Sequence, residues 1–167
     1  MFAVQPGDFA DKTARYADLL VQLDALVSDD RDGLANLANA SALLVQLLPD
    51  LNWVGFYLVR DGALRLGPFQ GRVACVHIAF GQGVCGTAVA ERRTVVVPDV
   101  RAFAGHIACD AASRAEIVVP LLAGDRLLGV LDLDSPQLGR FDDADAHGLE
   151  QVARLLASRS DWSRLVS

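Results

Sequence analysis

Hydrophobic residues recur every three or four positions in three segments of the chain, and this spacing is typical of amphipathic helices. The first segment is residues 16–27, and the second is residues 34–48, where Pro49 ends the pattern. The third begins at Asp142, a residue suited to cap a helix, and continues through Leu156. We therefore expect three long helices, each with one face buried against the rest of the protein.

Between the second and third helices the hydrophobic pattern alternates with a period of two, which predicts β-strands. Asp61-Gly62 and Gly124-Asp125 each separate two such strands and favour hairpin turns. Residues 87–93 are expected to form a short helix, and residues 99–114 a long loop with a partial helix. The expected strands are residues 52–59, 63–66, 73–80, 94–97, 117–122 and 127–133.

This order of elements predicts an α+β fold in which long helices cover one face of a central, mainly antiparallel sheet. Loops and short helices must cover the other face, and a ligand pocket could form there. We expect a single domain spanning residues 1–167, because this length suits one hydrophobic core. Hydrophobic residues make up 52% of the chain, which excludes a disordered segment.

The chain carries a formal net charge of −6, and this acid excess disfavours nucleic acid or an anionic membrane as the main partner. Residues 1–8 show no signal-peptide pattern, and no apolar run reaches the ~18 residues of a membrane span. We therefore expect a soluble, cytoplasmic protein.

The alternation within the strands indicates which side chains share a face of the sheet. Trp53 and Tyr57 lie opposite the apolar stripe of their strand, as do Glu116, Asp132 and Asp134 in theirs. An unpaired buried carboxylate is costly, although Asp134 is close enough to a strand end to be exposed. Two aromatic residues and three acids on one face predict a site for a ligand with a positive charge and an apolar part. The stripes expected to face the helices are Val54, Phe56 and Leu58; Ile117, Val119 and Leu121; and Leu127, Leu131 and Leu133.

Two interpretations are open for the three cysteines, Cys75, Cys85 and Cys109. They are either small buried hydrophobic residues, or they carry redox or metal chemistry. His106 lies three residues before Cys109, but intervals of 10 and 24 residues between cysteines match no common zinc pattern. We therefore expect no metal site.

Residues 81–86, Gly-Gln-Gly-Val-Cys-Gly, match the GxGxxG pattern of dinucleotide-binding loops. The helix expected after them is short, and alternating strand–helix–strand units are absent from the pattern. We therefore interpret this segment as a glycine-rich bend before a short helix.

Several longer motifs resemble those of the free methionine-(R)-sulfoxide reductases, which are built on a GAF fold. The matching segments cover most of residues 52–150, and all three cysteines stand at that family's spacing. The motifs are NWVGFY at 52–57, LGPFQG at 66–71, GQGVCGT at 81–87, VPDV at 97–100, GHIACD at 105–110, EIVVP at 116–120, GVLDLDSP at 129–136 and GRFD at 139–142.

The resemblance implies a thiol-dependent enzyme that reduces the R epimer of free methionine sulfoxide without a cofactor. Cys109 corresponds to the nucleophile, which becomes a sulfenic acid. Cys75 corresponds to the main resolving residue, and Cys85 to a cysteine that can form an alternative disulfide with the nucleophile. A dithiol protein such as thioredoxin would then reduce the disulfide.

The same resemblance places Trp53, Tyr57, Glu116, Asp132 and Asp134 in the substrate pocket. Charged carboxylates near a thiolate would oppose its formation, so we expect these acids to share a proton or to be neutralised by the substrate ammonium. Glu116 and Asp134 are expected to polarise or protonate the sulfoxide oxygen. Asp132 would maintain the shared proton or hold the amine, and Trp53 would pack on the S-methyl group.

The alternative is a non-catalytic GAF module that senses a small ligand. GAF domains often pair through their terminal helices. The last expected helix, with Leu149, Val152 and Leu156, could therefore serve either the core or a second subunit of a homodimer.

Overall fold

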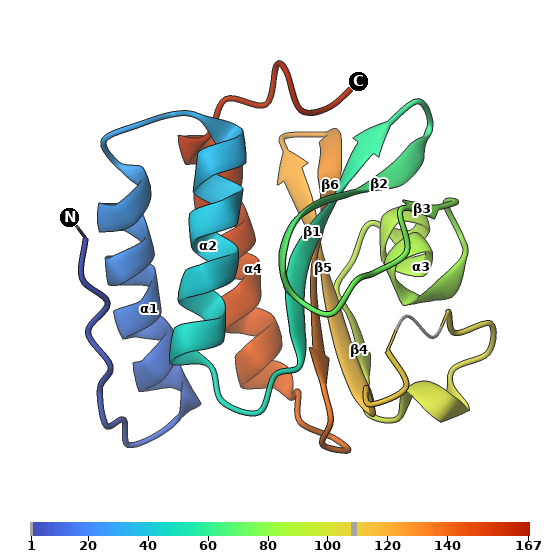
Figure 1. Ribbon diagram of the computed structural model, residues 1–167, viewed down its shortest axis with the longest axis horizontal. Helices are drawn as coiled ribbons and strands as arrows, with labels where there is room; N and C mark the ends of the chain where they lie inside the picture. The colour runs from blue at the N-terminus through green and yellow to red at the C-terminus, as the bar shows by residue number, and fades with distance from the viewer. Residues whose placement is uncertain (1, 108–109) are drawn as a thin grey trace.

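The computed structural model describes residues 2–107 and 110–167 (Figure 1). Two long helices, α2 (Gly33–Leu47) and α4 (Asp143–Arg159), lie on one face of a six-stranded sheet, and the third, α1 (Lys12–Val27), packs on them from the side away from the sheet. A short helix with several loops covers the other face, so the expected α+β architecture is confirmed. The strand order is β3-β2-β1-β6-β5-β4, and every neighbouring pair is antiparallel. The elements are α1 (Lys12–Val27), α2 (Gly33–Leu47), β1 (Trp53–Arg60), β2 (Ala63–Gly71), β3 (His77–Ile78), α3 (Gly83–Glu91), β4 (Val95–Val97), the 3-10 helix η1 (Val100–Ala102), β5 (Ala115–Ala123), β6 (Arg126–Ser135) and α4 (Asp143–Arg159).

Aspartate side chains cap the three long helices. Asp11 and Asp32 accept hydrogen bonds from backbone N–H groups in the first turns of α1 and α2. Asp142 does the same for α4. The Asp142 N–H in turn donates to the Asp145 side chain, which completes a capping box. These caps satisfy backbone donors that the helix itself cannot pair.

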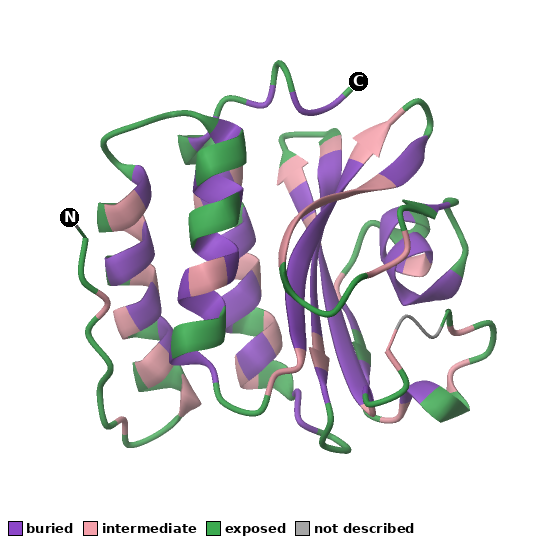
Figure 2. Ribbon diagram, viewed as in Figure 1, coloured by how far each residue is buried: buried purple, intermediate pink, exposed green. Residues whose placement is uncertain are grey.

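The larger hydrophobic core lies between the sheet and the helices α2 and α4, and it continues between these two helices and α1 (Figure 2). Val54, Phe56 and Leu58 of β1 point into it, as the alternation predicts. The helix residues Leu149, Val152 and Leu156 are buried in the same core, so they serve the core and are not available to a second subunit.

A buried ion-pair network joins α1 to α4. Asp145 is fully buried, and Arg140 donates from Nη1 to both of its carboxylate oxygens at 3.1 Å. The Tyr16 hydroxyl donates to Asp145 Oδ1 at 2.9 Å, and Lys12 pairs with both Asp142 and Asp145. The bonds from Tyr16 and Lys12 therefore depend on the docking of α1 on α4, whereas those from Arg140 and the Asp142 N–H are local to the start of α4.

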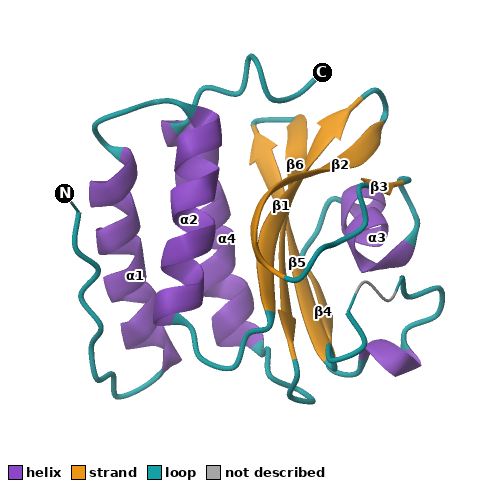
Figure 3. Cartoon of the chain, in the orientation of Figure 1, coloured by secondary structure: helices purple, strands orange, loops and turns teal. Residues whose placement is uncertain are grey.

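The prediction of a strand at residues 73–80 is wrong except at His77 and Ile78, which form β3. Gly71, with φ +132°, ends β2, and the chain then leaves the sheet until His77 and Ile78 pair with β2. Val73 and Val76, which suggested the strand, are 87% and 68% exposed. Figure 3 shows that loops form most of the chain between β2 and α3 and between β4 and β5.

Helix α3 begins at Gly83, four residues before the expected start, and ends at Glu91. Glycine lowers helix propensity, which concealed the first turn in the sequence. A Cβ at Gly86 would lie 2.5 Å from the carbonyl oxygen of Ala79, so the glycine allows the helix to pack closely on the preceding loop.

A β-bulge in β6 corrects one predicted orientation. Leu121 pairs with Gly129 and Leu122 with Leu127, so Leu128 is an extra residue in the ladder. Leu128 is consequently buried on the helix side, whereas Leu127, expected there, packs on the opposite side of the sheet.

None of the helices in the described residues is both long and apolar enough to cross a membrane.

Candidate active site

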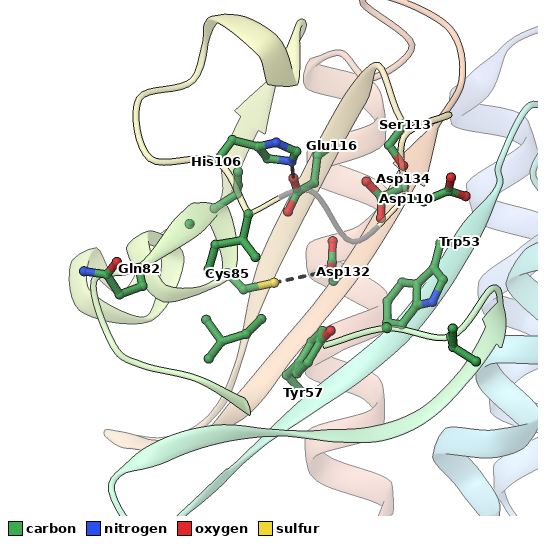
Figure 4. A pocket seen from close by; sticks show the side chains of 16 residues that line it. Trp53, Tyr57, Gln82, Cys85, His106, Asp110, Ser113, Glu116, Asp132 and Asp134 are labelled. Atoms are coloured by element: carbon green, nitrogen blue, oxygen red, sulfur yellow. Dashed lines mark hydrogen bonds and ion pairs between the residues drawn. The ribbon is translucent and has the colours of Figure 1, made fainter. Parts of the chain in front are cut away.

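The residues expected to form the pocket lie in two rows that cross the neighbouring strands β1, β6 and β5. In the first row Trp53 of β1 pairs with Asp134 of β6, which pairs with Glu116 of β5. In the second, Gly55 of β1 pairs with Asp132 of β6. Antiparallel pairing thus places all three acids next to one another on the face opposite the long helices (Figure 4).

The aromatic wall is a stack of rings on β1 and β2. The Trp53 ring stacks with Tyr57 at a centroid distance of 5.9 Å and with Phe69 at 5.4 Å. Gly55 makes this possible, because a Cβ there would lie 2.5 Å from the Trp53 ring and 2.4 Å from Phe69 Cβ. The Trp53 Nε1–H donates to the backbone oxygen of Arg72 at 3.0 Å, which fixes the indole and leaves its apolar surface facing the pocket.

Helix α3 brings Cys85 against the acids. The thiol is fully buried, and Sγ donates a hydrogen bond to Asp132 Oδ2 at 3.3 Å. Burial raises the pKa of Cys85 well above its ordinary value, and the negative charges of Asp132 and Glu116 raise it further. Cys85 is therefore held as a neutral thiol at neutral pH.

The three carboxyls cannot all be charged at once. Burial raises the pKa of Glu116 well above its usual range, and the charge of Asp134 adds to this effect. Burial likewise raises the pKa of Asp132, with further contributions from Glu116 and Asp134. The pKa of Asp134 rises to about 6, mainly through burial, although a hydrogen bond from Ser113 and the nearby His106 oppose the rise. The cluster therefore retains protons near neutral pH and can act as a general acid.

The structure adds residues that the sequence did not assign to the site. His106 Nε2 lies 3.4 Å from Glu116 Oε2. Asn52 donates from Nδ2 to Ser113 Oγ at 2.9 Å and to Asp110 Oδ2 at 3.1 Å. Asn52, His106 and Asp110 belong to the quoted motifs NWVGFY and GHIACD, so their motif membership was the available signal.

The structure describes two of the three cysteines that are predicted to carry the redox chemistry. Cys109, expected to be the nucleophile, lies outside the described residues, directly before Asp110. Cys75 lies in the loop between β2 and β3 and packs, partly buried, against the hydrophobic cluster on the pocket side of the sheet. Cys85 is placed in direct contact with Asp132.

The pocket between the sheet, α3 and the loop before β5 encloses about 540 Å³, part of it open to solvent. Trp53, Tyr57, Glu116, Asp132 and Asp134 all line it, as predicted. Its size suits a small molecule, and its lining combines an aromatic wall with proton-bearing acids and a thiol. Such a site can bind a small polar molecule with an apolar group and donate a proton to it.

Comparison with known proteins agrees with this fold and site. Residues 35–158 match the family model of the GAF domain, which defines the class of the protein. The chain is 53% identical over 146 residues to the free methionine-R-sulfoxide reductase of Escherichia coli, covering 87% of this chain and 88% of that protein. It is 54% identical over 158 residues to protein YtsP of Bacillus subtilis, covering 93% and 96%.

A solved structure gives the same result. The free methionine-R-sulfoxide reductase of Neisseria meningitidis, determined in complex with its substrate, superposes with a TM-score of 0.93 at 48% identity and covers 98% of both chains. The chain belongs to the GAF-fold family of free methionine-R-sulfoxide reductases.

Proposed function

We propose that the protein reduces free L-methionine-(R)-sulfoxide to methionine in this pocket, without a cofactor. The observation that carries the proposal is the row of Trp53, Asp134 and Glu116 across three strands, which sets an apolar ring beside acids that keep a proton. The two relatives named as free methionine-R-sulfoxide reductases, one of them solved with its substrate, support the same reaction.

Each part of the substrate has a suitable partner in the pocket. Glu116 and Asp134 polarise and protonate the sulfoxide oxygen, because their raised pKa values keep a proton available. Asp132 helps to hold the shared proton or binds the amine, and Trp53 packs on the S-methyl group, which gives the R preference a steric basis. We expect methionine within a polypeptide to be rejected, because its two flanking amide bonds would need an exit path from the pocket.

The redox steps use the protein's own thiols. The Cys109 sulfur attacks the sulfoxide sulfur, and the protonated oxygen leaves as water when the S–O bond breaks. Water then cleaves the new S–S bond, so methionine leaves and Cys109 becomes a sulfenic acid. A second thiol attacks the sulfenic sulfur and forms a disulfide, with release of water. Thioredoxin then exchanges its dithiol for this disulfide and is itself oxidised, which restores both cysteines. Because the cycle needs reduced thiols, we place the protein in the cytoplasm.

Of the two candidate resolving residues, we favour Cys75. The attacking species in thiol–disulfide chemistry is the thiolate, and the raised pKa of Cys85 keeps that form scarce at neutral pH. Cys85 serves as the alternative resolving thiol, once Asp132 has lost its negative charge or the pocket has opened.

An assay coupled to thioredoxin, thioredoxin reductase and NADPH tests the proposal. We expect NADPH oxidation that depends on free L-methionine-(R)-sulfoxide, none with the S epimer or a sulfoxide-containing peptide, and none in Cys109→Ser. Cys75→Ser should retain one turnover but lose most multiple turnover. Saturable binding of a small ligand without turnover would instead support the sensor function. Full activity in Cys109→Ser would overturn the assignment of the nucleophile.

A further inference from the structure

Three potential metal ligands converge in the buried part of the pocket. Cys85 Sγ, a carboxylate oxygen of Glu116 and one of Asp132 all lie within 4.8 Å of one another. They come from three separate elements, α3, β5 and β6, which explains why the spacing of residues along the chain gives no sign of them. All three residues are buried, so this group is not a solvated acidic patch.

The separation of two of these ligand atoms fits a tetrahedral ion. With metal–sulfur and metal–oxygen bonds of about 2.3 and 2.0 Å, two ligands in tetrahedral zinc lie about 3.5 Å apart. Cys85 Sγ and Asp132 Oδ2 are 3.3 Å apart, so an ion could replace the thiol proton with little movement of either side chain.

A second observation concerns Asp132 alone. Its Oδ1 is buried and has no hydrogen-bond partner among the described residues. Burying a carboxylate oxygen without a partner costs free energy, and a bound ligand at this atom would offset that cost. The groups that face Asp132 in the pocket are Cys85, Glu116 and Asp134, and none of these supplies a positive charge (Figure 4). A cation at this point would satisfy the orphaned oxygen and relieve the repulsion between the acids.

His106 supports the third ligand from outside. Its Nε2 lies 3.4 Å from Glu116 Oε2, which is the position of the outer partner that commonly orients a ligand carboxylate. Three protein ligands leave a fourth position open, and all three of these residues line the pocket in which we place the substrate.

We propose that the reduced protein binds one thiophilic divalent cation, Zn²⁺ or Cd²⁺, through Cys85, Glu116 and Asp132, and that this ion excludes the sulfoxide substrate. The sulfur ligand favours these ions over Mg²⁺ and Ca²⁺, which prefer oxygen. Metal binding stands on the geometry of the three residues. The exclusion of methionine sulfoxide rests in addition on the proposed function.

The binding experiment uses the full chain, fully reduced, with Cd²⁺ or Zn²⁺ as the only added metal. We expect one ion per chain by equilibrium dialysis, a thiolate–Cd²⁺ absorption band in the ultraviolet, and no binding of Mg²⁺. Cys85→Ser should abolish the band and weaken Cd²⁺ binding more than about tenfold. Asp132→Asn should weaken it without removing a thiol, and His106→Gln should weaken it about tenfold.

Cys75→Ser is the matched control, because it removes a cysteine outside the ligand group and should leave the band and the affinity unchanged. The proposal is overturned if no stoichiometric Cd²⁺ or Zn²⁺ binds, if Cys85→Ser keeps the band, or if Cys75→Ser loses it.

Competition links the metal to the reaction. We expect free methionine-(R)-sulfoxide to lower the apparent Cd²⁺ affinity, and Zn²⁺ to inhibit turnover competitively. Metal binding through Cys85 in a protein that cannot reduce the sulfoxide would leave the metal site standing and refute the proposed function. Turnover that is insensitive to Zn²⁺, in a protein that binds no metal, would leave the proposed function standing and refute the metal site.

Discussion

Glu116 and Asp134 stand directly opposite each other on β5 and β6, so two acids share one cross-strand pair near the end of this ladder. Like charges in this arrangement destabilise a sheet, and both side chains are largely buried as well. This unfavourable contribution to folding stability lies on the face of the sheet that carries the pocket. The cost predicts how stability and activity should respond to substitution.

Asp132→Asn should stabilise the fold at neutral pH while it removes activity. A buried acid with a raised pKa contributes full stability below its unfolded pKa of about 4, and that stability is lost as the pH rises toward the folded pKa. The amide never ionises and can still accept the Cys85 hydrogen bond. We expect a gain of about 1 kcal/mol or more at pH 7–8, roughly 2–4 °C in Tm, which shrinks toward pH 4.

Thermal unfolding between pH 4 and pH 8 measures this difference. Asp125→Asn, in the exposed turn between β5 and β6, is the matched control and should show no such trend. An equal Tm for Asp132→Asn and the wild type at every pH would contradict the prediction.

Gly55→Ala should disturb the aromatic wall. The added methyl group would meet both the Trp53 ring and Phe69 Cβ at distances that no relaxed structure tolerates. We expect a loss of about 1–3 kcal/mol in stability and a rise in KM for the sulfoxide, with a changed near-ultraviolet circular dichroism signal. Gly62→Ala, in a turn with open space around it but φ +73°, should cost stability and leave KM unchanged. A wild-type KM in Gly55→Ala would argue against the role of the Trp53 stack.

Asn52→Ala should impair catalysis more than folding. Its Nδ2 ties β1 to Ser113 and Asp110, and Asp110 directly follows the proposed nucleophile Cys109. Loss of these bonds should lower kcat/KM by about 10–100-fold, corresponding to roughly 1–3 kcal/mol. Asn39→Ala, on an exposed face of α2, is the control. Steady-state kinetics decide, and an unchanged kcat/KM would exclude Asn52 as a positioning residue.

Asp145→Asn should destabilise the protein far from the pocket. The substitution leaves Arg140 and Lys12 without their shared buried partner, so we expect a loss of about 3–5 kcal/mol in urea unfolding. Asp143→Asn, exposed in the same first turn of α4, should change the free energy of unfolding by less than about 0.5 kcal/mol. If the two variants unfold at the same urea concentration, the ion-pair network does not hold α1 on α4.

Local pattern was sufficient to predict the long helices and the two faces of the central strands. The side of a helix or strand that meets the core is set by the order of hydrophobic and polar residues along the chain. This order is visible in residues 16–27 and 34–48 and in the alternation around Trp53 and Asp132. The bulge at Leu128 was not predictable, because an extra residue in a ladder arises from pairing with a partner strand. The contacts of Cys85 with Asp132 and of His106 with Glu116 were missed for a similar reason, since each joins segments that only tertiary packing brings together.

The pairing of β1 with β6 has a consequence for biosynthesis. Trp53 is made early and Asp134 late, and β1 must wait for nearly the whole chain before the row of pocket residues can close. A ribosome-bound chain therefore exposes Cys85 while its acidic neighbours on β6 are still missing. Until these acids arrive, the charges that help to keep Cys85 a neutral thiol are absent, so the newly made chain is more vulnerable to oxidants than the folded protein.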